Sequence, residues 1–422
     1  MSHDRRIHRQ SDDGAEAAGE GSIQKVPERN PEAEEGSRLS PAPLKVALVH
    51  DWLNGMRGGE IVFEALLDLY PDADVFTLIH EPRKLSSSLQ KKLGRTRVHA
   101  SFLNVLKFTR SRYRQLLPIL PFAIRSFDLY PYDLIVSSSH CVAKGVRKHP
   151  EAVHVSYLHA PMRYMWDRFQ DYFGKGRIHP LFRWIALLVR PFLQAWDRRT
   201  AAKDRVDVLL ANSNFIGEQI RRCYCREART IYPFARLDRF KRERRPGSFY
   251  LMVGAFAPYK RTDLAIEAFA RLGLPLKIVG SGQDEDRLRD LRDSLRARNV
   301  EFIRNASNDE IERLYSECKA FIFPGVEDFG ITPLEAMASG APVIAFGEGG
   351  ACETVTPETG ILFSAQTVES LCNAVMDLES GRRHFFENSC RARAAFFTES
   401  RFKEEIQSAV RDAQKLIASA PF

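Results

Sequence analysis

The chain has 422 residues, 44% of them apolar, which is enough for two full domains and unusually long for a single globular core. Its formal charge is +8, and since residues 1–40 carry a net −3, the remainder carries +11. A basic body of this kind narrows the partners to nucleic acid, an anionic membrane face or phosphorylated substrates, and composition does not choose among them.

Residues 1–43 are polar, charged and rich in Gly, Pro, Ser and Glu, which predicts a disordered N-terminal tail. The N-terminus has no apolar signal core, and no later run approaches the roughly 20 apolar residues of a membrane-spanning helix. Seven scattered cysteines do not make a disulfide framework. We therefore expect a cytoplasmic protein that neither crosses the membrane nor is exported by a visible signal.

The segment 44–235 alternates apolar strands with helical patterns, which predicts a first domain with a parallel, doubly wound sheet. A glycine turn, Gly58-Gly59, follows the first strand and precedes a helical pattern, so its backbone could approach a ligand closely, or serve packing alone. His159 directly follows another strand and is either a site residue or a satisfied structural histidine. Strands are expected at 45–49, 74–78, 133–137, 153–158 and 206–211.

Two segments of this first domain are basic and apolar at once. Residues 91–126 contain nine Lys or Arg and no acid, and residues 174–203 repeat the theme with several aromatic side chains. Helices of this composition can lie in the headgroup region of an anionic membrane. The alternative is a helix that packs on the sheet and leaves a basic edge in solvent.

Residues 236–247 are charged and turn-like, which indicates an interdomain linker, and a second alternation over 248–397 predicts a second Rossmann-like domain. Residues 398–422 should form a C-terminal helix that packs back toward the first domain. Two such domains make a cleft, and open parallel sheets bind ligands at the carboxyl ends of their strands. Strands are expected at 248–253, 276–279, 300–303, 320–323 and 342–345, and helices at 262–272, 284–298, 308–316, 333–339, 368–379 and 401–417.

The stretch 321–353 reads as strand, loop, helix and strand, with acidic side chains in the loop. Thr332 is predicted to cap the helix and Pro333 to take its first position. Glu327 in the loop and Glu335 in the helix would then lie beside a positive helix end, which suits an anionic ligand that also carries hydroxyls. Thr332-x-x-Glu335 is also a capping box, which is the structural alternative for Glu335.

Lys260 and Arg261 lie in a loop that opens the helix expected at 262–272. These two residues could simply be solvated charges. Cations at a helix start oppose the helix dipole, however, so some other reason is needed for their position there. Cations and free N–H groups neutralise the charge of a diphosphate, while carboxylates accept hydrogen bonds from vicinal hydroxyls. A ligand with both features is a nucleotide sugar. The acidic run at 284–286 sits at a helix start, where acids are favoured, and we expect no metal there.

At this point the residues resemble a family, the retaining glycosyltransferases of family four with the GT-B fold, which include bacterial mannosyltransferases. The segment from Glu327 to Glu335 looks like that family's E-x7-E motif, and the stretch after it is similar to its EAMA-GxPVIA continuation. The segments 259–269 and 280–282 are similar to further blocks of the family. The resemblance runs from about Lys45 to the last helix.

The resemblance implies a role for each matching residue. Glu327 would bind hydroxyls of the donor sugar and act in catalysis with His159, which would lie near the primary hydroxyl of that sugar. Glu335 would bind the ribose and Lys260 the diphosphate, with Arg261 beside it. Backbone N–H groups would assist from Gly58, Gly59, Gly330, Ile331 and Thr332. No metal and no cofactor is expected, because cations and helix dipoles stabilise the leaving group.

The family often has an arginine shortly before the lysine, where this chain has Ala255, and Arg261 or Arg163 would have to supply that charge. The reaction implied is transfer of a hexose, with GDP-mannose the expected donor, to a lipid-linked or polysaccharide acceptor at the inner membrane face. Nucleic acid is not an expected partner. A nucleotide-sugar epimerase or hydrolase with the same fold is the alternative, and a non-catalytic membrane-associated scaffold is another.

Overall fold

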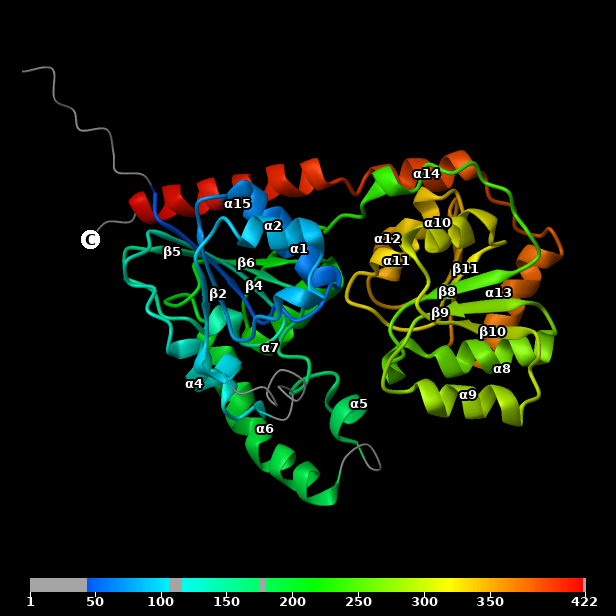
Figure 1. Cartoon of the computed structure of the whole chain (residues 1–422), viewed down its shortest axis with the longest axis horizontal. Coiled ribbons are helices and arrows are strands. Elements are labelled where there is room, and N and C mark those ends of the chain that lie inside the picture. The colour runs from blue at the N-terminus through cyan, green and yellow to red at the C-terminus, as the bar shows by residue number, and fades with distance from the viewer. Residues whose placement is uncertain (1–43, 106–115, 175–178, 420–422) are drawn as a thin grey trace, which may run out of the picture. The chain divides into compact units, whose positions relative to one another are not determined.

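The computed structural model describes residues 44–105, 116–174 and 179–419. These residues form two parallel sheets that are flanked by helices (Figure 1). The first sheet has the strand order β3-β2-β1-β4-β5-β6-β7, and the second has the order β10-β9-β8-β11-β12-β13. Without the edge strand β7, both orders are the 3-2-1-4-5-6 order of doubly wound dinucleotide-binding folds. The predicted architecture of two Rossmann-like α/β domains is confirmed.

The first sheet is built from short strands that are apolar on both faces, because helices cover each side. Consecutive residues of its central strand show this: Leu48 belongs to one hydrophobic cluster, and Ala47 and Val49 belong to the other. The strands are β1 (Val46–His50), β2 (Asp74–Thr77), β3 (Val98–Ala100), β4 (Leu134–Ser139), β5 (Val153–Leu158), β6 (Val208–Ala211) and β7 (Arg229–Thr230). The helices are α1 (Gly58–Leu69), α2 (Ser87–Leu93), α4 (Leu120–Arg125), α5 (Phe169–Phe173), α6 (Pro180–Thr200) and α7 (Asn214–Tyr224).

The second sheet repeats this plan, with α8, α9 and α13 against one hydrophobic cluster and α10, α11 and α14 against another. Its strands are β8 (Tyr250–Val253), β9 (Leu276–Val279), β10 (Val300–Ile303), β11 (Phe321–Phe323), β12 (Val343–Phe346) and β13 (Gly360–Phe363). The helices are α8 (Thr262–Leu272), α9 (Glu285–Ser294), α10 (Asn308–Glu317), α11 (Ile331–Ala338), α12 (Ala351–Thr354), α13 (Val368–Glu379) and α14 (Glu387–Ala395).

The last helix, α15 (Glu399–Ala418), follows the second domain in sequence but packs on the first. It runs beside α1 and contacts β5 (Figure 1). The ring of Phe402 meets that of Tyr157 edge to face at 5.5 Å, and Lys403 Nζ lies 2.9 Å from Asp68 Oδ2 on α1. A segment from the end of the chain therefore completes the hydrophobic core of the first domain.

Several elements differ from those predicted by the sequence. The short strands β3, β7 and β13 and the helix α12 were not expected, and α14 lies where the sequence has helical periodicity but no bounds were predicted. The strands at 153–158, 276–279 and 300–303 and the helices at 262–272 and 368–379 have the predicted bounds. The predicted tail 1–43 lies outside the described residues, as do 106–115 and 175–178 of the two basic segments.

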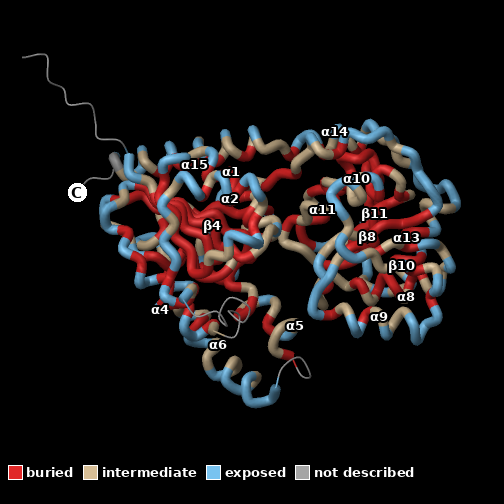
Figure 2. Tube along the Cα trace, viewed as in Figure 1, coloured by how far each residue is buried: buried red, intermediate tan, exposed pale blue. Residues whose placement is uncertain are grey.

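Burial separates the sheets from the outer helices (Figure 2). Every residue of β4 is buried, whereas much of α6 is exposed. Over the ranges that the structure describes, no helix combines the length and the apolar character that spanning a bilayer requires.

Candidate active site

The predicted site residues lie at the carboxyl ends of strands near the point where the strand order of each sheet reverses. In the first sheet, Gly58 comes after β1 and His159 directly follows β5. In the second sheet, Lys260 comes after β8 and Glu327 after the neighbouring strand β11. Crevices at such reversal points are where doubly wound sheets bind ligands, so the topology brings these residues to ligand-binding positions.

The glycine pair opens helix α1 and faces the second domain. A Cβ on Gly58 would lie 3.0 Å from Cδ1 of Ile331, the first residue of α11, so only glycine fits there without a shift. A Cβ on Gly59 would lie 3.6 Å from His50 Cε1 and 3.7 Å from His159 Nε2, which is ordinary contact. The N-terminus of α1 thus lies between the histidines of its own domain and the N-terminus of α11.

His159 belongs to a buried polar cluster. Its Nε2 lies 2.8 Å from Ser138 Oγ, and His50 Nδ1 lies 3.1 Å from the same hydroxyl. Burial holds the pKa of His159 well below its usual value, and the neighbouring histidines lower it further. Burial also lowers the pKa of His50, to about 4. Both rings are therefore neutral at physiological pH and exchange hydrogen bonds rather than carry charge.

Asp51 fixes the loop that follows β4. Its carboxylate accepts backbone N–H groups from His140 at 2.7 Å, Cys141 at 2.9 Å, and Val142 and Ala143 at 2.7 Å each. Sequence reasoning did not select His50, Asp51, Ser138 or His140 as site residues. A signal for them was present, because His50 ends β1 with Asp51 directly after it, and Ser138 lies at the end of β4 with His140 directly after that strand. These two strands are adjacent at the order reversal.

Lys260 and Glu327 make an ion pair in the second domain. Burial lowers the pKa of Lys260 and the carboxylate of Glu327 raises it, with a net rise, so the ammonium stays charged. Arg261 adopts a left-handed backbone conformation, with φ +53°, and its guanidinium lies 3.3 Å from Asp263 and donates to Gln366 at 2.9 Å. Arg261 therefore contacts the first turn of α8 through Asp263, whereas Lys260 pairs with Glu327.

The loop between β11 and α11, residues 324–330, carries Glu327, and we call it the glutamate loop. It packs against two glycines that follow β12. A parallel bridge joins Glu327 to Gly349, and Gly350 N–H donates to Glu327 O at 2.9 Å. Gly349 has φ +79°, and a side chain there or on Gly350 would meet the backbone of Glu327 or Phe329. The glycines let the two loops pack backbone against backbone, which holds Glu327 in place.

The predicted start of helix α11 is wrong. The helix begins at Ile331, and Gly330, with φ +90°, is its N-cap, so Thr332 is inside the first turn and the Thr332 to Glu335 capping box is not formed. The reason is the turn at Gly330, whose positive φ starts the helix two residues before Pro333. First-turn N–H groups have no partner inside a helix, so those of Ile331 and Thr332 suit an anionic ligand at this helix end.

Glu335 lies on the same helix and is partly buried. Its Oε2 accepts a hydrogen bond of 3.0 Å from the hydroxyl of Tyr315. Burial raises the pKa of Glu335, although the Tyr315 hydrogen bond and Arg239 oppose that rise. Without the capping-box role, the carboxylate has one oxygen held by Tyr315 and a second that can accept from a ligand hydroxyl.

Six contacts tie the two domains together beside these residues. Arg163 of the first domain makes an ion pair with Asp328 of the second. Arg168 donates to Val326 O at 2.6 Å and stacks over the Tyr259 ring. On the other side of Asp328, its backbone oxygen accepts from the Ser213 hydroxyl, and the carboxylate of Glu353 accepts N–H groups from residues 214 and 215 at 2.8 and 2.9 Å. Arg163, which follows His159 closely in the sequence, therefore brings a positive charge of the first domain to the glutamate loop.

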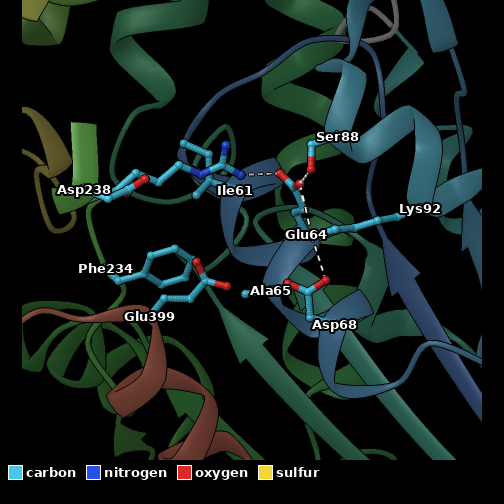
Figure 3. A pocket seen from close by; sticks show the side chains of 10 residues that line it. Ile61, Glu64, Ala65, Asp68, Ser88, Lys92, Phe234, Asp238 and Glu399 are labelled. Atoms are coloured by element: carbon cyan, nitrogen blue, oxygen red, sulfur yellow. Dashed lines mark hydrogen bonds and ion pairs between the residues drawn. The ribbon is translucent and has the colours of Figure 1, made fainter.

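A cavity of about 240 Å³ lies away from this constellation, where the interdomain linker passes α1 and the start of α15 (Figure 3). Glu64 is its central side chain: it pairs with Arg236 of the linker and with Lys92, and it accepts from the Ser88 hydroxyl. Because most of its lining charges are already paired with each other, we interpret it as a packing defect at the domain junction. The described residues contain no group of three His, Cys, Asp or Glu side chains placed to hold a metal ion.

The second domain matches a known family of proteins. Residues 235–394 match the family model described as Glycosyl transferases group 1. The GDP-mannose-dependent monoacylated alpha-(1-6)-phosphatidylinositol monomannoside mannosyltransferase of Corynebacterium glutamicum is 36% identical over 134 residues, covering 29% of this chain and 35% of that protein. O-antigen chain mannosyltransferase C of Escherichia coli is 30% identical over 159 residues, covering 36% of this chain and 43% of that protein. The chain thus matches well under half the length of these relatives.

Solved structures extend the likeness to the first domain. The crystal structure of HepE from Anabaena in complex with UDP aligns with a TM-score of 0.62 and 16% identity, covering 87% of this chain and 100% of that one. This agreement shows the fold, and it confirms the GT-B architecture that the sequence motifs predicted. Residues 235–394 are therefore a domain of the glycosyl transferases group 1 family, set in a two-domain chain with the GT-B fold.

Proposed function

We propose that this protein is a retaining glycosyltransferase that moves a hexose from a nucleoside-diphosphate sugar to a lipid-linked or polysaccharide acceptor. One observation carries the proposal: the N-termini of α1 and α11 meet at Gly58 and Ile331, with Lys260 and two glutamates beside them. Two positive helix ends and a partly buried cation suit a diphosphate, and carboxylates suit the hydroxyls of the sugar and ribose.

The diphosphate is the leaving group of this reaction, so negative charge grows on it in the transition state. N–H groups of the first turns of α1 and α11, together with the Lys260 ammonium, would stabilise that charge without reorganising. Glu327 would accept hydrogen bonds from hydroxyls of the donor sugar, and Glu335 from those of the ribose. These roles need no metal ion and no cofactor.

The acceptor proton needs a destination, and the buried histidines do not offer one. The rings of His159 and His50 are neutral, with pKa values lowered by burial, so neither holds a proton readily. We therefore infer that the acceptor hydroxyl attacks the anomeric carbon from the face that the diphosphate leaves. As the C–O bond to the acceptor forms and the C–O bond to phosphate breaks, a departing phosphate oxygen takes the proton. His159 would hydrogen-bond the sugar.

The donor is proposed to be GDP-mannose. Support comes from two relatives whose names describe mannosyltransferases, one of them dependent on GDP-mannose. Both are similar to part of this chain, at 36% identity over 134 residues and 30% over 159 residues. The proposed base and sugar of the donor are therefore inferred from similarity to these relatives. The class of donor, a nucleoside-diphosphate sugar, is inferred from the site itself.

A thermal-shift panel of GDP-, UDP- and ADP-mannose and the corresponding glucose donors tests the proposal, since a ligand that binds only the folded protein raises its melting temperature. We expect GDP-mannose to stabilise the protein most and Lys260→Ala to abolish the shift. Glu218→Ala, an exposed helix position on α7, is the control and should keep it. No stabilisation by any donor would overturn the proposal, and release of free sugar at the same rate with and without acceptor would indicate a hydrolase.

A further inference from the structure

Helix α6 has two unlike faces. Its inner face packs on the hydrophobic cluster of the first domain through Leu187, Val189, Leu193 and Trp196. Its outer face is apolar as well, although it is exposed (Figure 2). Solvent-facing sides of surface helices are usually polar, so a helix that is apolar on both faces lacks a partner on one of them.

The exposed face forms a continuous stripe rather than scattered contacts. Leu181, Trp184, Ile185, Leu188 and Phe192 recur at three- and four-residue spacing, and their side chains are between 41% and 75% exposed. At about 1.5 Å per residue the stripe runs for about 16 Å along the helix axis. We call these five residues the α6 stripe.

Only positive charge accompanies the α6 stripe on its own helix. The four arginines of α6 are Arg183, Arg190, Arg198 and Arg199. The exposed pair Arg198-Arg199 lies at the end of the helix, where Arg199 also pairs with Asp204 beyond it. The one acid, Asp197, is fully buried and paired with Lys144. With four arginines in 21 residues, the helix suits the surface of a bilayer rather than its interior.

We propose that the α6 stripe docks on an anionic lipid bilayer, with the helix axis parallel to the surface and the stripe in the headgroup region. Apolar and aromatic side chains flanked by arginines, without an exposed acid on α6 itself, match a surface that is apolar below and negative above. A second copy of this chain fits less well, because the arginines of the two α6 helices would repel each other. Phe122 of α4, which packs on the same core and is exposed, extends the apolar surface of this domain.

The inner face of α6 connects this surface to the candidate active site. Arg190 and Gln194 each donate to Met165 O at 2.9 Å, and Asp197 accepts from Trp166 Nε1 at 2.8 Å. The segment they hold, 162–168, carries the arginine that pairs with Asp328. Resting on the proposed function, docking at the α6 stripe would hold the cleft close to a membrane-embedded acceptor.

Vesicle co-sedimentation of the full chain tests the docking. We expect binding to vesicles of phosphatidylglycerol and phosphatidylcholine, and at least tenfold weaker binding to phosphatidylcholine alone. Leu188→Ser with Phe192→Ser should weaken binding to the anionic vesicles at least tenfold. The matched control is Phe386→Ser with Leu416→Ser, which removes two side chains that are 66% and 67% exposed elsewhere, and its binding should stay within twofold of wild type.

Trp184 supplies a second readout, because it is the exposed tryptophan of the stripe, whereas Trp52 is buried. Brominated lipids should quench the fluorescence of the wild type on anionic vesicles, and Trp184→Phe should remove most of that quenching. Equal binding of the stripe variant and the control, or no binding by the wild type, would overturn the proposal. So would self-association that the stripe variant abolishes without any vesicle binding.

Donor binding keeps the two proposals distinguishable. The stripe variant should retain the thermal shift with the nucleotide sugar, because none of its changed residues lies in the cleft. Vesicle binding without any donor binding would leave the docking intact and overturn the proposed enzymatic function.

Discussion

Glu327→Gln should separate binding of the nucleotide from transfer of the sugar. Glu327 and Lys260 are paired, with only 14% and 18% of their side chains exposed, yet we assign them to different parts of one ligand. In the free protein the carboxylate occupies an ammonium that the diphosphate also needs. Glutamine keeps the shape of the side chain and removes its charge, so it frees Lys260 and weakens the contact with the sugar at once.

The magnitude follows from the ion pair. A phosphate on the same ammonium would lie about 5 Å from the carboxylate, and two unit charges at that distance repel by about 3 kcal/mol at an effective dielectric constant of about 20. Residual exposure screens part of this repulsion, so we expect a gain of about 1 to 2 kcal/mol for free nucleoside diphosphate, or about 5- to 30-fold in Kd. Transfer should fall at least about 100-fold, because a charged hydrogen bond to the sugar is lost.

Isothermal titration with GDP, UDP and ADP measures the first effect, and single-turnover transfer measures the second. Asp263→Asn is the matched control, since it removes one negative charge from the same turn but pairs with Arg261 instead of Lys260. Its affinity for the diphosphate should change less than about threefold. If Glu327→Gln weakens binding of the free diphosphate in step with transfer, the assignment of Lys260 and Glu327 to separate ligand groups is refuted.

Three further changes test the site and its support. Gly58→Ala places a Cβ 3.0 Å from Ile331 Cδ1 and should weaken donor binding severalfold, and Ile331→Val, which removes that carbon, should restore it; titration of the double variant decides. Asp197→Asn leaves Lys144 buried without its counter-ion and should cost about 3 to 5 kcal/mol in urea unfolding, whereas an unchanged midpoint would contradict the pairing. Burial lowers the pKa of His154 from 6.5 to about 4, so the unfolded chain takes up that proton first and stability falls as pH drops from 6.5 toward 4. His154→Gln should flatten that fall by on the order of 3 kcal/mol, and an unchanged pH slope would argue against the shift.

The sequence predicts those parts of the fold that have a strong local pattern. The strand at 276–279 and the helix at 262–272 have clear apolar periodicity and come out with the predicted bounds. The edge strand Val98–Ala100 is three residues long and mostly exposed, so its pairing with β2 decides its conformation rather than its own composition. Helix α14 is polar and nearly without an apolar face, and contacts with α11 sustain it.

The candidate site shows the same division. The glutamates, Lys260 and His159 stand in recognisable patterns after strands, which is why the sequence selects them. The hydrogen bonds between His50 and Ser138 join residues 88 positions apart, and the ion pair of Arg163 with Asp328 joins residues 165 apart. Such contacts depend on the order of strands in the sheet and on the approach of two domains. Neither can be read from local periodicity.

The position of helix α15 gives this chain an order of assembly. The second domain is one continuous stretch, so its core can close as soon as that stretch leaves the ribosome. The first domain is synthesised earlier but needs Phe402, Ile406 and Val410 in its core. The strands of the first domain therefore stay incompletely covered until the second domain has been synthesised as well. A chain that ended before Glu399 would lack α15 and would expose apolar surface on the first domain. Loss of the last helix would thus harm a domain whose own segment, 44–235, had been translated in full.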